Sequence, residues 1–107
     1  MKTTLKKLSE IVAKANDVFF NKFEHVDTVM GIMDKTLRKQ GMNADAITID
    51  CIAIDKKIVI LIHDNKPNSV DIAVGNKEGD IFSSSEYVLN DISDSTILEI
   101  MEVNFID

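Results

Sequence analysis

The chain has 107 residues, of which 45% are hydrophobic and 28% are charged, the balance of a folded protein rather than a disordered one. Its single cysteine excludes an intrachain disulfide, and its longest apolar run, five residues over 58–62, is far shorter than the roughly 20 residues that a membrane-spanning helix needs. These features predict one cytoplasmic domain over 1–107 that has no membrane segment and needs no cofactor to fold.

The net charge of −6 is unevenly distributed along the chain. Residues 1–41 carry a net charge of +3 and residues 42–107 one of −9, and no basic residue follows Lys77. The negative charge of residues 42–107 disfavours direct contact with nucleic acid and favours a basic protein surface as the partner. Acidity that only keeps the protein in solution is the alternative. As candidate partner-binding residues we take five acidic side chains of the last segment: Glu86, Asp91, Asp94, Glu99 and Glu102.

The first forty residues have the period of amphipathic helices. Apolar residues recur at steps of three and four from Leu5 to Phe23, which predicts a helix over about 4–23. A second helix is expected from Asp27, a suitable N-cap, to Gly41, a residue type that commonly ends helices. The residues that repeat the helical period in this second segment are Val26, Val29, Met30, Met33 and Leu37. One long, kinked helix is the alternative.

Two large apolar residues lie outside the main stripes of these predicted helices. They are Phe20 and Ile32. An apolar side chain on a helix face that does not point into the hydrophobic core of the domain can contact another chain. Phe20 and Ile32 are therefore candidates for an apolar interface, including that of a homodimer.

From Ala46 onward the apolar period changes to two, which predicts strands. The first is expected over 46–54, with a bulge where the alternation shifts phase. The nearly continuous apolar segment 57–63 is typical of a central strand covered on both faces, and 70–74 alternates again. Residues 81–89 are either a fourth strand or irregular, because three consecutive serines interrupt them.

The last segment predicts a helix over about 96–105, with Thr96 and Glu99 spaced as a capping box. Short connections between the strands favour an antiparallel meander. Helices grouped before and after the strands indicate the α+β class. The predicted fold is therefore an N-terminal helix pair, a three- or four-stranded antiparallel meander and a C-terminal helix.

Catalytic motifs are scarce in this sequence. Cys51 and His63 are the one pair that suggests nucleophilic chemistry, and a hairpin turning at Lys56 would bring them near each other. Cys51, however, alternates with Ile47 and Ile49, so it is expected in the core as a small apolar side chain. With two histidines and one cysteine, the chain offers no tetrahedral zinc ligand set, and no metal is expected.

The sequence therefore favours a non-enzymatic interaction protein that binds a basic protein surface as an adaptor, chaperone or inhibitor. Its predicted arrangement is broadly similar to that of acidic chaperone and inhibitor domains of bacteria. Two alternatives stay open: an inhibitor whose carboxylates mimic the phosphates of a nucleic acid, and a small enzyme that uses Cys51 or a carboxylate pair.

Overall fold

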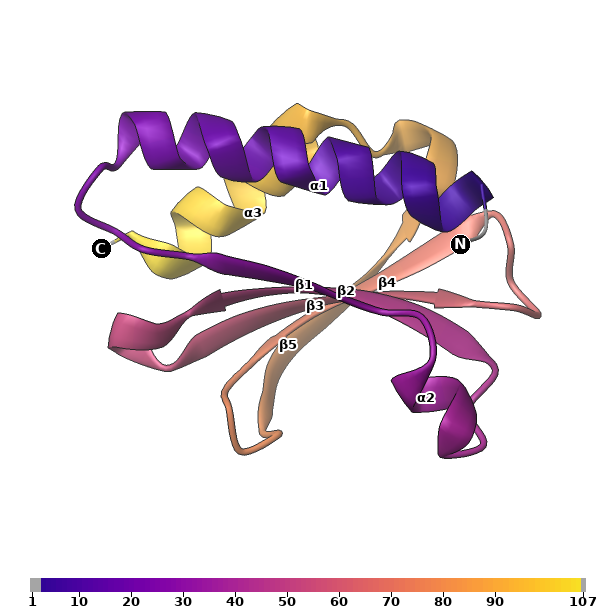
Figure 1. The fold of residues 1–107 in the computed structure, drawn as a ribbon. Helices are drawn as coiled ribbons and strands as arrows, with labels where there is room; N and C mark the ends of the chain where they lie inside the picture. The colour runs from indigo at the N-terminus through magenta and orange to yellow at the C-terminus, as the bar shows by residue number, and fades with distance from the viewer. Residues whose placement is uncertain (1–2, 107) are drawn as a thin grey trace.

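Helix α1 (Thr3–Lys22) begins the part of the chain that the computed structural model describes, residues 3–106. Its bounds agree with the prediction to within one residue. The apolar residues that set its period form the buried face, which consists of Leu5, Leu8, Val12, Ala15 and Phe19. The ring of Phe19 packs against those of Phe23 and Phe105, with centroids 5.0 and 6.1 Å apart. The buried face of α1 therefore packs in one core with residues of the sheet, and the helix lies over one face of that sheet (Figure 1).

The predicted second helix is wrong. Strand β1 (Val29–Met33) takes its place and is followed by a single helical turn, α2 (Thr36–Lys39). Strand β1 pairs antiparallel with β2 (Ala44–Cys51), whose edge would otherwise lack hydrogen bonds. The two strands approach closely at Gly31, where a Cβ atom would lie 2.9 Å from the hydroxyl oxygen of Thr48 on β2. Gly41 does adopt the expected left-handed conformation, with φ of +89°.

The sheet has five strands rather than the predicted three or four. After β2 come β3 (Lys56–His63), β4 (Ser69–Gly75) and β5 (Ile81–Val88), and the spatial order follows the chain order. Every pairing is antiparallel, so the predicted meander is confirmed. Short 3-10 turns, η1 (Ile52–Ile54) and η2 (Leu89–Asp91), follow β2 and β5. The serine run lies inside strand β5, which settles the alternative for 81–89 in favour of a strand.

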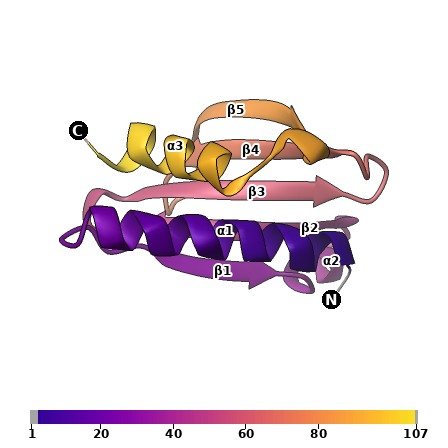
Figure 2. The same cartoon turned by 90° about the horizontal axis from the view of Figure 1, so that it is seen from above.

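Helix α3 (Asp94–Phe105) ends the fold and lies beside α1 over one face of the sheet (Figure 2). Its capping box starts at Ser93, not at the predicted Thr96. The Ser93 hydroxyl accepts a bond from the Thr96 N–H, and the Thr96 hydroxyl accepts one from the Ser93 N–H. Its buried residues are Ile97, Met101 and Phe105.

The core lies between this helical layer and the sheet. On the helical face, buried isoleucines of β2 and β3 meet α1 and α3. The opposite face has no helix over most of its area, so β3 is not covered on both faces as predicted (Figure 1). Its outward residues Val59 and Leu61 are only half-buried. Within residues 3–106, no helix combines the length and apolar character that crossing a membrane requires.

Candidate interaction groove beside strand β5

Two helices are too narrow to cover five strands. Strands spaced about 4.8 Å apart make this sheet about 24 Å wide, whereas two packed helices cover about 20 Å. Helix α1 lies over β1 and β2, and α3 packs on α1 and over β3 (Figure 2). Strand β5 therefore lies outside the helical layer. The groove between β5 and α3 follows from this difference in width.

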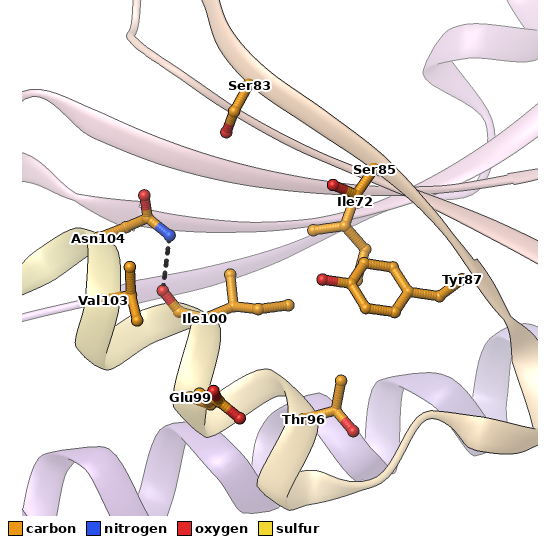
Figure 3. Close-up of a pocket in the computed structure, with 9 residues that line it drawn as sticks. All are labelled: Ile72, Ser83, Ser85, Tyr87, Thr96, Glu99, Ile100, Val103 and Asn104. Carbon is orange, nitrogen blue, oxygen red and sulfur yellow. Dashed lines mark hydrogen bonds between the residues drawn. The ribbon is translucent and has the colours of Figure 1, made fainter.

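The groove has a volume of about 460 Å³ and is open to solvent. Ser83, Ser85 and Tyr87 point into it from alternate positions of β5, and Ile72 of β4 forms its floor (Figure 3). The α3 wall consists of Thr96, Glu99, Ile100, Val103 and Asn104. The two walls run in opposite directions, so Thr96 lies at the Tyr87 end and Asn104 at the Ser83 end (Figure 3).

The polar side chains of the groove are all able to accept hydrogen bonds. They are four hydroxyls, the Asn104 amide and the Glu99 carboxylate, and none of the described residues that line the groove is a lysine, arginine or histidine. The Asn104 amide nitrogen donates to the Ile100 carbonyl at 2.8 Å, which turns the amide oxygen away from that carbonyl (Figure 3). Within residues 3–106, no basic side chain forms an ion pair with Glu99. This wall suits a ligand that carries donors and positive charge.

Strand β5 also has a free backbone edge. The N–H of Leu89 donates to the carbonyl of Asn68 at 2.8 Å, and this bonded pair continues the β4–β5 register. Bonded pairs recur at every second residue of an antiparallel ladder. The backbone groups of Ser83, Ser85 and Tyr87 therefore face β4. Those of Ser84, Glu86 and Val88 face outward.

The five predicted acidic residues do not gather on one surface. Alternation along β5 places Glu86 on the sheet face opposite the groove, where it meets Lys66 at 3.3 Å. Two others meet lysines of α1: Asp94 pairs with Lys14 at 3.7 Å and Glu102 with Lys22 at 2.8 Å. Asp91 lies in η2 and Glu99 in the groove. A nucleic-acid mimic would need these carboxylates on one face, and this arrangement differs from that.

Phe20 and Ile32 are both exposed, at 53% and 41%, but they lie far apart. Strand β1 runs antiparallel to α1, and Thr28 just before it donates a hydrogen bond to the Asn16 side chain. Phe20 lies near the C-terminal end of α1 and Ile32 near the C-terminal end of β1, and these two ends lie at opposite sides of the helix–strand pair (Figure 2). They do not form a single apolar patch.

The expected proximity of Cys51 and His63 is wrong. Cys51 pairs with Lys56 at one end of the β2–β3 hairpin, and His63 pairs with Ala44 at the other. Cys51 is 1% exposed, as expected of a core side chain, and burial raises the pKa of its thiol. His63 instead contacts Asp71, with 3.2 Å between its Nε2 and the carboxylate. Within residues 3–106, histidine, cysteine and acidic side chains form no group suited to a metal ion.

The sequence interpretation missed most of the groove. The run of three serines over 83–85 resembles an interruption in the sequence, although Ser83, Ser85 and Tyr87 have the two-residue spacing of one strand face. Glu99 was selected for its charge and does line the groove. Val103, which is 73% exposed on a helix, could not be distinguished from a core residue by its period. The chain matches no protein-family model, no curated protein sequence and no solved structure.

Proposed function

We propose that this is a non-enzymatic interaction protein, of the adaptor, chaperone or inhibitor type, that binds a basic segment of another protein in the groove between β5 and α3. The observation that carries the proposal is the position of Glu99. Among the described residues that line the groove, Glu99 carries the one formal charge, and the other polar groups can all accept hydrogen bonds. A lysine or arginine side chain supplies the complementary charge and several donors.

The contrast with the other carboxylates supports the same site. Glu86, Asp94 and Glu102 each have a lysine of the same chain within 4 Å, so their charge is partly compensated before any partner arrives. No lysine of residues 3–106 pairs with Glu99, so an incoming cation gains more from this carboxylate. The net charge of −6 adds a longer-range attraction that raises the rate of encounter with a basic chain.

Fluorescence anisotropy with a labelled peptide that alternates threonine and arginine, beginning and ending with threonine, tests the proposal on the full-length chain. We expect measurable binding that weakens as salt rises from about 50 to 300 mM, because mobile ions screen exposed charges. Glu99→Gln should weaken binding about threefold, the effect expected for one exposed ion pair.

Glu10→Gln is the matched control. Glu10 is an exposed residue of α1, and α3 separates α1 from β5. Glu10→Gln changes the net charge by the same amount as Glu99→Gln. Equal weakening by the two substitutions would show that only net charge matters, and the groove would then have no specific role. Absence of binding at low salt would contradict the proposal as a whole.

A further inference from the structure

We propose that the basic segment binds as a sixth antiparallel strand along the free edge of β5, with every second side chain in the groove. This inference rests on the proposed function, which gives the partner its charge, and adds the way in which the partner is held. Strand addition is a common mode of peptide recognition, in which backbone bonds supply affinity and side-chain pockets supply specificity.

The edge of β5 is unusually open for strand addition. Proteins protect edge strands with lysine, proline, bulges or a covering element. Over its eight residues β5 has neither lysine nor proline, and Glu86 is its single charged residue. Val74 pairs with Ser83 and Gly75 with Ile81, so Phe82 is the extra residue of a bulge at the start of β5, and the edge from Ser83 to Val88 is regular. The outward backbone groups of Ser84 and Glu86 are therefore aligned to receive another strand.

The register determines which partner side chains enter the groove. In an antiparallel pair, residues directly opposite each other point to the same face. Partner residues opposite Ser83, Ser85 and Tyr87 therefore lie over the groove, and the residues between them point to the open face of the sheet. Along α3, Glu99 lies between Thr96 and Val103 (Figure 3). A basic residue opposite the middle of β5 reaches Glu99, and an apolar residue toward the Ser83 end contacts the exposed Val103.

A second copy of this chain fits the edge less well than a basic segment. Antiparallel pairing of β5 with its copy would place two Glu99 side chains on the same face of the joined sheet. It would also join two molecules that each carry −6. Like charges brought together in this way oppose association. The other edge strand, β1, has five residues, and the cavity of about 590 Å³ that its Val29 helps to line is also lined by Lys56, Lys57 and Lys77, which oppose a basic partner.

N-methylation of the probe peptide separates strand addition from simple charge attraction, because it removes backbone donors and leaves every arginine charged. In the proposed register, arginine side chains occupy the groove and threonine N–H groups face β5. We expect methylation of the threonine nitrogens to weaken binding at least about tenfold, a loss of about 1.4 kcal/mol. Methylation of the arginine nitrogens, which face solvent, should leave it within about twofold.

Ser84→Pro tests the same contact from the protein side. The Ser84 N–H faces outward and its side chain points away from the groove, so proline removes an edge donor without breaking the β4–β5 ladder. We expect about tenfold weaker binding, with Ser84→Ala, which keeps the donor, binding like the wild type. If this proline variant does not fold, the methylated peptides decide alone.

The outcomes distinguish the two proposals. If both methylated peptides bind equally well, or if only arginine methylation weakens binding, antiparallel strand addition is refuted while a basic partner stands. If no basic peptide binds, the proposed function is refuted, and the strand-addition inference that rests on it is refuted with it. Sedimentation that shows a dimer of the wild type, lost in Ser84→Pro, would assign the edge to a second copy and overturn the inference.

Discussion

Gly75→Ala tests the close packing at the start of the β4–β5 hairpin. A Cβ atom at this position would lie 2.1 Å from the carbonyl oxygen of Asp80 and 3.2 Å from its carbonyl carbon, whereas ordinary contacts begin near 3.4 Å. The oxygen belongs to the backbone and accepts a bond from the Asn76 N–H at 3.1 Å, so relief of the clash requires the turn itself to move. The bulge at Gly75 would be lost or displaced with it.

The expected cost is about 3 kcal/mol, the upper part of the usual range for overpacking, because no flexible side chain can move aside. Unfolding entropy of about 2.1 cal/mol/K per residue gives about 0.22 kcal/mol/K for this chain, so the melting temperature should fall by about 13 °C. Calorimetry or circular dichroism during heating measures the fall.

Gly31→Ala is the control for this prediction. The clashing atom there is the Thr48 hydroxyl oxygen at 2.9 Å, part of a side chain that can rotate. We expect a loss below about 1 kcal/mol, or less than about 5 °C. If Gly75→Ala melts within error of the wild type, or no lower than Gly31→Ala, the account of the hairpin is refuted.

Three further predictions concern stability. Ser93→Ala should cost about 1 kcal/mol by removing the α3 cap, which thermal melting would show as a fall of about 4 °C. The Cys51 thiol should resist iodoacetamide until the protein unfolds. Burial raises the pKa of this thiol, so the unfolded chain loses the thiol proton more readily and the free energy of unfolding should fall as pH rises above the ordinary pKa of 9.0. Cys51→Ala should remove this part of the pH dependence. Arg38→Met should lower the melting temperature, because Asp45 is only 4% exposed and would lose its hydrogen bonds of 2.9 and 3.0 Å to the guanidinium. Adding Asp45→Asn to this variant should restore part of the lost stability, because it removes the unpaired buried charge.

Each of the last two predictions has an outcome that would contradict it. Prompt alkylation of Cys51 in the native protein would mean that the β2 end is open to solvent. A double variant of Arg38 and Asp45 no more stable than Arg38→Met alone would mean that the buried carboxylate is already well solvated. Arg38 also bonds Asp64 at 2.8 and 2.9 Å, a contact near the surface that should contribute less.

Local pattern predicted the segments that face a single environment. The three- and four-residue steps of α1 persist for about five turns, and one face of that helix is fully buried. In β4, Val70, Ile72 and Val74 alternate in the sequence, and all three are buried. In each case the residues of one face are apolar and buried, so their spacing in the sequence shows the period of the helix or the strand.

The failures lie where a segment's conformation depends on its neighbours. The apolar residues from Val29 to Met33 suit either a helix or a strand, and the unpaired edge of β2 decided the matter. Strand β5 lacks a continuous apolar face because no helix lies above it, so its serines resemble an interruption. A short polar segment can therefore be a strand when the pairing comes from β4.

By itself the sequence determined the helix α1, the antiparallel succession of strands, the burial of Cys51 and the uneven distribution of charge. Only the tertiary structure decided which charges stay uncompensated. Lys14 and Lys22 are distant in sequence from Asp94 and Glu102, yet the packing of α1 against α3 brings each lysine to its carboxylate. The same packing leaves Glu99 beside an uncovered β5, because the width of two helices is less than that of five strands.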